Sequence, residues 1–141
     1  MRQKLALVAA AVAVAVTVLV ASGCGGVDRA VPVVSITERD FKILVPRVVP
    51  AGDVRVVVRN KGPVSHELLI IRATGEQLPR RVDGFTIDEE ALEPLLVVTI
   101  EPEGPGTQSS VRAHLVPGRY IVLCNMSGHA SGGMLTSFRV R

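Results

Sequence analysis

The chain has 141 residues, which is enough for one domain with a single modest core. It contains no Trp, one Tyr and three Phe, and its formal net charge is +3. Of the 16 Lys and Arg residues, Arg2 and Lys4 lie at the extreme N-terminus, which leaves 14 for the rest of the chain against 13 acidic residues. Because there is no basic cluster and few aromatic rings are present to stack on bases, the composition argues against nucleic-acid binding.

The N-terminal segment has the layout of an export signal. Arg2 and Lys4 precede an uncharged apolar run over residues 5–21, and small residues then stand directly before Cys24. This ending resembles a bacterial lipobox, which implies cleavage before Cys24 and attachment of lipid to its sulfur. An uncleaved transmembrane anchor is the alternative, because 17 apolar residues are just long enough to span a bilayer.

These features divide the chain into a signal peptide over 1–23, a tether over 24–30 and a folded domain over 31–141. We expect the domain to be held at the outer face of a bacterial cytoplasmic membrane by the lipid on Cys24. Two Cys in an exported protein would usually suggest a disulfide. If Cys24 carries lipid, however, Cys124 has no partner, and a bound metal would both protect and employ its thiol.

Val-rich segments alternate with turn signals along the domain, and β-branched Val favours strands. Strands are expected over 31–37, 41–45, 54–59, 66–71, 95–100, 109–115, 120–124 and 135–140. Segment 54–59 places Val54, Val56 and Val58 on one face and two Arg on the other, as a half-buried strand does. Segment 66–71 is apolar on both faces and should lie centrally. Seven or eight short strands with turn-rich connections predict an all-β fold, an antiparallel β-sandwich.

One short helix is expected over 88–93, ended by Pro94. Thr86 and Glu89 fit a capping box, in which a hydroxyl and a carboxylate satisfy free backbone N–H groups. We interpret the four acidic residues of this region as the solvated start of a helix rather than as a docking patch.

Cys124, His129 and Met134 lie within eleven residues, between the last two expected strands. His66 begins the central strand with the same parity as Leu68, so its ring should point toward the core at one end of the sheet. A thiolate with two imidazoles, completed by a long, weak bond to a thioether, suits copper that cycles between two oxidation states. Taken alone, Met134 would more often be core packing.

Two other residues could be mistaken for ligands. Met126 lies two positions after Cys124, but the geometry of a strand end directs it elsewhere. His114 has the parity of an exposed strand residue beside Arg112, so it is left out of the site.

The pattern Asn60-x-Gly62-x-x-x-His66, followed by Pro117-Gly-x-Tyr120-x-x-x-Cys124-x-x-x-x-His129-x-x-x-x-Met134, resembles the cupredoxins. The four-residue gaps on both sides of His129 are most similar to the rusticyanin and sulfocyanin branch. The resemblance covers essentially all of 31–141 and implies a Greek-key β-sandwich with one mononuclear type 1 copper ion. By the same resemblance the ligands would be His66, Cys124, His129 and Met134.

The chain departs from this family beside two of its ligands. In many relatives an Asn or Ser follows the first His, a Ser or Thr follows the Cys, and these residues link the ligand loops by hydrogen bonds. Glu67 and Asn125 occupy these positions here. We predict that they hydrogen-bond to each other, through side chains or backbones, and that together with Asn60 they support the ligands.

The resemblance implies a membrane-tethered carrier of single electrons rather than an enzyme. Redox protein partners, expected from a respiratory chain, would dock around His129, whose neighbours have small side chains. Copper storage, or copper delivery to exported enzymes, is the alternative and would require the metal to leave readily. A zinc enzyme with a Cys/His₂ site would need an open coordination position and a general base, and the sequence offers no evident convergent carboxylate.

Overall fold

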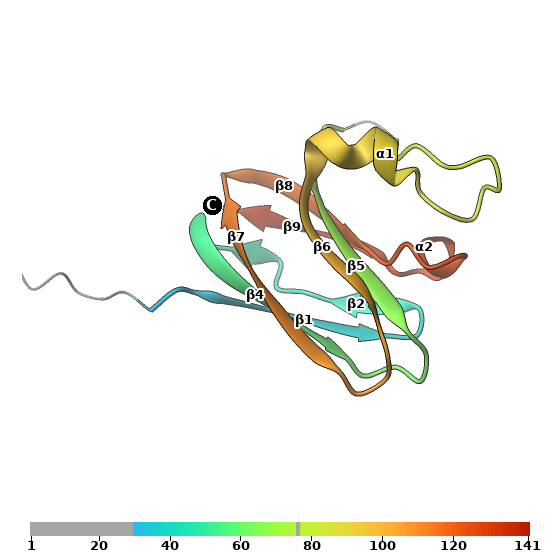
Figure 1. Ribbon diagram of the computed structural model, residues 1–141. Helices are drawn as coiled ribbons and strands as arrows, with labels where there is room; N and C mark the ends of the chain where they lie inside the picture. Colours follow the sequence, from blue (N-terminus) through green and yellow to red (C-terminus); the bar gives the residue numbers. More distant parts are fainter. Residues whose placement is uncertain (1–29, 76) are drawn as a thin grey trace, which may run out of the picture.

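The computed structural model describes residues 30–75 and 77–141, and the expected signal peptide, Cys24 and most of the tether lie outside this part. Two β-sheets face each other in it (Figure 1). The four-stranded sheet, in the order β2-β1-β4-β7, contains Lys42–Leu44, Val33–Arg39, Gly52–Asn60 and Gln108–Leu115. The five-stranded sheet, in the order β3-β9-β8-β5-β6, contains Val48–Val49, Leu135–Val140, Gly118–Leu123, His66–Arg72 and Leu96–Glu103.

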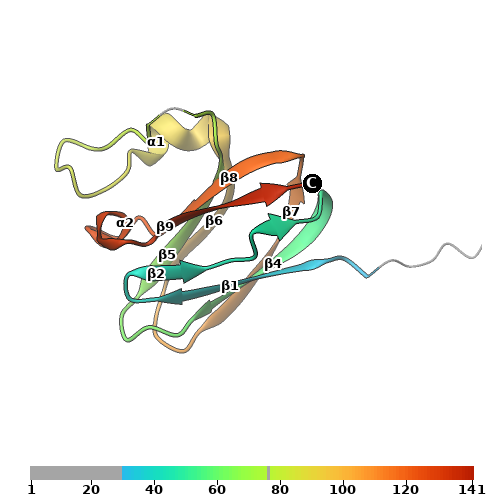
Figure 2. The same cartoon turned by 180° about the vertical axis from the view of Figure 1, so that it is seen from behind.

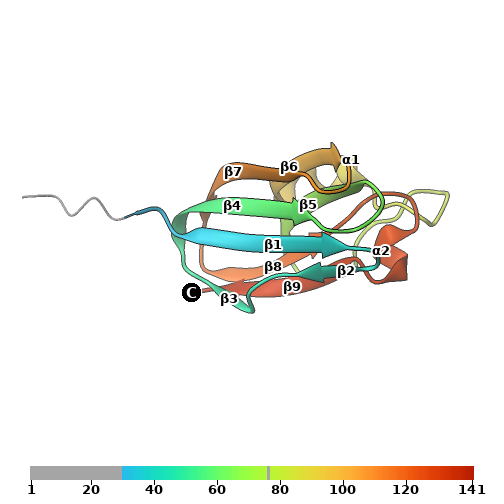
Figure 3. The same ribbon diagram turned by 90° about the horizontal axis from the view of Figure 1, so that it is seen from below.

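This architecture confirms the predicted all-β sandwich. Most neighbouring strands are antiparallel, but β1 pairs with β4, and β3 with β9, in parallel. Figure 3 shows the short strand β3 beside β9 near the C-terminus. Alternation of apolar residues predicts which face of a strand is buried but not which neighbour it pairs with, so the parallel pairs could not be predicted.

The main core lies between the sheets. Val54, Val56 and Val58 of β4 are buried there, as their alternation predicts, and they pack with residues of the facing sheet such as Leu68 and Val122. Phe138 and Val140 of β9, and Met134 directly before it, are buried on the predicted face. The strand β6 continues through Pro102, which was expected in a loop, because β6 is an edge strand and an edge tolerates a residue without an N–H.

A second core lies on the outer face of the five-stranded sheet. There Leu69 and Ile71 of β5 and Leu123 pack against Ile87 and Leu92 of the segment that precedes β6. This segment contains a single helical turn, α1 (Glu89–Leu92), followed by the 3₁₀ turn η1 (Glu93–Leu95). The main core covers one face of β5 and the second core covers the other, which explains why the strand is apolar on both faces. It pairs with β6 and β8 in the central position predicted for it.

The predicted helix is present, but the predicted capping box is wrong. Asp88 is the N-cap of α1, and its side chain accepts a hydrogen bond from Ala91 N at 3.4 Å. Thr86 instead joins a turn around Asp83, whose carboxylate accepts from the backbone N–H groups of Phe85 and Thr86. The described helices are too short to cross a membrane, including a second turn, α2 (His129–Gly132), that was not predicted.

One end of the sandwich gathers α2, the turn between β1 and β2, and the loop that precedes α1, while the C-terminus lies at the other end (Figure 2). The β1–β2 turn consists of Asp40 and Phe41, between the paired residues Arg39 and Lys42. Phe41 has φ 47°. This left-handed conformation costs a bulky residue on the order of 1–3 kcal/mol, so the surrounding contacts must hold it.

Candidate metal centre

His66 is the first residue of β5 and is only 1% exposed. Its Nε2 lies 3.1 Å from Oδ1 of Asp40, although the two atoms are not aligned as a hydrogen bond. A Cβ at Gly62 would lie 2.7 Å from this Nε2 and 2.6 Å from the Asp40 carboxylate, so the ring packs where only glycine leaves room. Burial, and then the neighbouring His129, lowers the pKa of His66 below its usual value, while Asp40 partly opposes this effect.

Cys124 directly follows β8 and is fully buried, and its sulfur faces both imidazoles. Sγ lies 3.4 Å from Nδ1 of His129 and 3.9 Å from Nδ1 of His66. The backbone N–H of Glu67 donates to the sulfur at 3.4 Å. Burial raises the pKa of the Cys124 thiol, and the backbone N–H groups of Glu67 and Met126 partly offset this.

His129 begins α2 and is half-buried. Its Nδ1 lies 3.3 Å from Nδ1 of His66, and its backbone N–H donates to Met126 O at 2.9 Å. Gly128, the N-cap of α2, has φ 79°, a conformation that favours glycine, and this residue turns the chain back toward the sulfur.

Met134 is fully buried in the same core cluster as Cys124. Its carbonyl accepts from Cys124 N at 3.0 Å, and its N–H donates to His129 O at 2.9 Å. These bonds place Met134 beside the other two residues of the loop. Its role as the fourth ligand stays a prediction.

The donor set of this site fits copper. One ligand atom each from His66, Cys124 and His129 lies within 4.8 Å of the others. Among the His, Cys, Asp and Glu residues that the structure describes, these three form the group that could hold a metal ion. One thiolate with two imidazoles is the trigonal set that copper electron-transfer sites use. No carboxylate belongs to this group of described residues.

Asn60 fixes the loop that leads to His66. It is buried, its Oδ1 accepts from Gly62 N at 2.8 Å, and its Nδ2 donates to Val64 O at 2.8 Å and to Glu103 O at 3.0 Å. Since Glu103 lies in β6 opposite His66, these bonds join the loop to the strand beside the ligand.

Asn125 has partners other than the one predicted. Its Oδ1 accepts from Ile87 N at 2.7 Å, and its Nδ2 donates to Ile87 O at 3.1 Å and to Glu89 Oε1 at 2.5 Å. The predicted bond to Glu67 is absent from the hydrogen bonds of the described residues, because the segment before β6 lies over the loop and occupies the Asn125 amide. Glu67 instead supports Cys124 through its backbone N–H.

Among the other residues near the ligands, Phe41 was missed by the sequence reading. Its ring meets the ring of His129 edge-on, with centroids 5.7 Å apart. A large aromatic residue is unusual in a two-residue hairpin turn, which usually holds Gly or Asn, but the turn itself becomes visible only in the structure. Met126 packs against the main core, and His114 is exposed and paired with Asp53.

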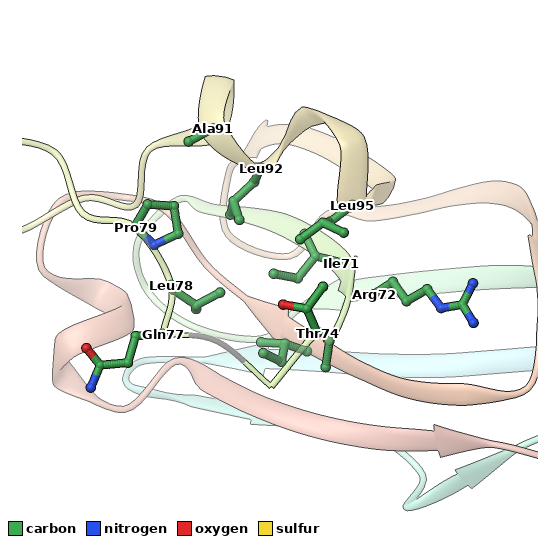
Figure 4. A pocket seen from close by; sticks show the side chains of 11 residues that line it. Ile71, Arg72, Thr74, Gln77, Leu78, Pro79, Ala91, Leu92 and Leu95 are labelled. Carbon is green, nitrogen blue, oxygen red and sulfur yellow. The ribbon is translucent and has the colours of Figure 1, made fainter.

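A cavity of about 190 Å³ lies away from the ligands, between α1, η1 and the outer face of the five-stranded sheet. Figure 4 shows Leu78, Leu92 and Leu95 gathered around Ile71 in its wall. It contains none of the metal-ligand candidates, so the sandwich end that carries His129 remains the candidate functional site.

No protein-family model matches the chain, and no curated protein sequence matches it either. Solved structures do match. Auracyanin from the photosynthetic bacterium Roseiflexus castenholzii is 22% identical with a TM-score of 0.60, and the match covers 77% of this chain and 96% of that one. Rusticyanin from Thiobacillus ferrooxidans is 18% identical with a TM-score of 0.57, covering 77% of each chain. An azurin from Methylomonas sp. strain J is 13% identical with a TM-score of 0.53, covering 78% and 98%.

Auracyanin, rusticyanin and azurin are cupredoxins. The fold and the donor set agree with the ligand pattern in the sequence. The chain therefore has the cupredoxin fold, and its His66, Cys124 and His129 cluster, with Met134 beside it, points to a single mononuclear copper ion.

Proposed function

We propose that the protein is a one-electron carrier with a type 1 copper site, tethered to the outer face of the cytoplasmic membrane. The observation that carries this proposal is the triangle formed by Cys124 Sγ and the Nδ1 atoms of His66 and His129, with separations of 3.3–3.9 Å. Copper bound there would supply a redox couple, copper(II)/copper(I), whose two states differ by one electron.

The surrounding residues favour electron transfer over release of the metal. Cys124 and Met134 are tied by a backbone hydrogen bond, and Asn60 and Asn125 each fix a neighbouring segment with several bonds. A site held this firmly limits the rearrangement of its ligands when the charge of the ion changes. The same rigidity opposes the opening of the loop that storage or delivery of copper would require.

The surface around His129 is suited to brief contact with a redox protein. Gly128, Gly132 and Gly133 add no side chains beside the half-buried imidazole. Phe41 and Phe85 are 55% and 59% exposed. Phe41 contacts His129, and the Phe85 carbonyl accepts from Gly128 N at 3.2 Å, so both phenylalanines flank the same loop. A small apolar surface of this kind permits rapid association and release.

The tether would leave this surface free. The described chain enters β1 at the end of the sandwich opposite α2 (Figures 1 and 2), so lipid on Cys24 would anchor the far end of the domain. Replacement of Cys24 by Ala is expected to abolish incorporation of labelled fatty acid and to release the domain from the membrane fraction. Retention of label in that variant would exclude this site of lipidation.

The proposed activity is tested by repeated reduction and oxidation of the copper-loaded protein in the presence of a competing copper(I) chelator. We expect reversible one-electron cycles with copper retained in both states. His114→Ala is the matched control, because His114 is exposed and pairs only with Asp53, and it should behave as the parent does. Transfer of copper to the chelator at each reduction would instead support copper delivery.

A further inference from the structure

The turn between β1 and β2 contacts both histidines of the site. Asp40 lies 3.1 Å from Nε2 of His66, and Phe41 meets the ring of His129. Phe41 is the non-glycine residue with positive φ in the described chain, at 47°. Asn or Gly would adopt this conformation at far lower cost. A strained residue persists only where its surroundings hold it, and such positions cluster at functional sites.

The contacts of Phe41 show what holds it. A Cβ at Gly132 would lie 2.5 Å from Cδ1 of its ring, and a Cβ at Gly133 would lie 2.8 Å from its carbonyl oxygen. The ring and the backbone of Phe41 therefore fit closely against the ligand loop, at two successive positions without side chains. The fit depends on both sides, because a methyl group on either glycine would displace the turn or the loop.

These contacts leave His129 enclosed on two sides. Its ring has His66 on one side, with centroids 5.2 Å apart at 63°, and Phe41 on another, with centroids 5.7 Å apart at 74°. No described side-chain hydrogen bond to His129 comes from outside the ligand cluster. Outside the ligand cluster, the orientation of the half-buried imidazole therefore depends on packing, and the ring of Phe41 provides part of that packing.

We propose that Phe41 is a positioning residue for His129, and that the strained turn is retained because it presses the aromatic ring against this ligand. The inference rests on the proposed copper site. The function assigned to the β1–β2 turn is to orient the His129 ring. An ordinary hairpin turn would not have this function, and neither would a residue that only contacts a docking partner.

The first test uses the purified protein without metal. Phe41→Asn relieves the left-handed strain and removes the ring. We expect its thermal midpoint to stay within about 3 °C of the parent's, a change of less than about 1 kcal/mol, because lost contact and lost strain offset each other. The NMR signals of the His129 imidazole should broaden or double as the ring samples other orientations.

The second test measures the copper affinity and the copper EPR spectrum of the same variant. Partners of ligating histidines typically contribute about 10- to 100-fold to metal affinity, so Phe41→Asn should weaken copper affinity by about tenfold and alter the copper EPR spectrum. Phe41→Tyr keeps the ring and should restore both properties. Gly132→Ala should reproduce the change from the opposite side, since its methyl group displaces the ring.

Phe85→Asn is the matched control, because Phe85 is similarly exposed and flanks the same loop without a ring contact to His129. It should leave the His129 signals and the copper affinity unchanged. Parental His129 signals in Phe41→Asn, or equal changes in Phe85→Asn, would overturn the inference. If the parent failed to bind copper, the proposed function would be wrong, and the metal-free NMR comparison would still decide whether Phe41 orients His129.

Discussion

Burial sets the protonation of the ligands at the scale of single residues. It raises the pKa of the Cys124 thiol and lowers the pKa of His66, so the metal-free site holds both side chains in their neutral forms at neutral pH. The imidazole is then ready to bind a metal, while the thiol must first lose its proton.

Copper affinity should therefore increase with pH. Release of one thiol proton on binding predicts an increase of about tenfold per pH unit as long as Cys124 is protonated in the free protein. A titration against a competing chelator at pH 6, 7 and 8, corrected for the chelator's own protonation, measures this slope. A pH-independent affinity would mean that the thiol is already ionised or does not bind.

Glu38 is a second residue whose protonation is set by burial. It is 2% exposed on the inner side of β1, and Oε1 has no hydrogen-bond partner among the described residues. Burial, and to a lesser extent Glu103, raises the pKa of Glu38 from 4.5 to about 7. Between pH 4.5 and about pH 7, Glu38 keeps its proton in the folded protein but has released it in the unfolded chain. Stability should therefore fall as the pH rises across this interval, by up to about 3 kcal/mol from this group.

Glu38→Gln removes this dependence, because the amide stays neutral. Metal-free Glu38→Gln should be more stable than the parent in urea unfolding at pH 8, and the advantage should disappear near pH 4.5. Glu90→Gln, at an exposed position, is the control and should change little. An advantage of equal size at both pH values would show that the carboxylate does not titrate in this range.

At the scale of elements, the segment before β6 is joined to the ligand loop. Asn125 makes a pair of bonds with the backbone of Ile87, and Ile87 is itself fully buried. Arg80 adds an exposed contact to Ser131, at 3.0 Å. The segment that covers the outer face of the five-stranded sheet thereby also limits movement of the residue that follows Cys124.

Asn125→Ala should leave the N–H and the carbonyl of Ile87 without partners, at a cost of about 1–3 kcal/mol in the free energy of unfolding. Hydrogen exchange at the Ile87 amide should accelerate. Ser131→Ala removes only the exposed contact to Arg80 and should cost less than about 0.5 kcal/mol. Equal costs in the two variants would show that the buried pair of bonds does not join the segment to the loop.

Elements differ in how far the sequence predicts them. The central place of β5 was predictable, because residues 66–71 are apolar on both faces. The start of α1 was not predictable, since Thr86 and Asp88 both have side chains that can cap a helix. Thr86 is bound in the turn around Asp83, which leaves Asp88 as the N-cap. The bonds of Asn125 were also beyond prediction, because they join residues 38 positions apart through a segment without a strong pattern of its own.

The candidate ligands could be predicted because their types and spacing are unusual together, whereas Phe41 could not. Its importance follows from a φ of 47° and from the fit against Gly132, and neither property is visible in the residue type. Sequence reading thus identified the chemistry of the site, while the means of positioning it required the structure.

At the scale of the whole molecule, the sandwich would separate the proposed membrane attachment from the candidate metal site. The described chain enters β1 at one end, and α2, which begins with His129, lies at the other (Figure 3). The main core between the sheets connects these ends as one packed unit. A carrier of this shape could stay anchored while its exposed histidine edge meets a partner.

The visible absorption spectrum of the purified protein, with one equivalent of copper(II), tests the central claim most directly. A Cys124 thiolate bound to copper with two imidazoles predicts an intense blue colour that bleaches on reduction and is absent from Cys124→Ser. The His114→Ala protein should remain as blue as the parent. A colourless copper adduct of the parent, or a blue Cys124→Ser protein, would contradict the assignment of a type 1 copper site.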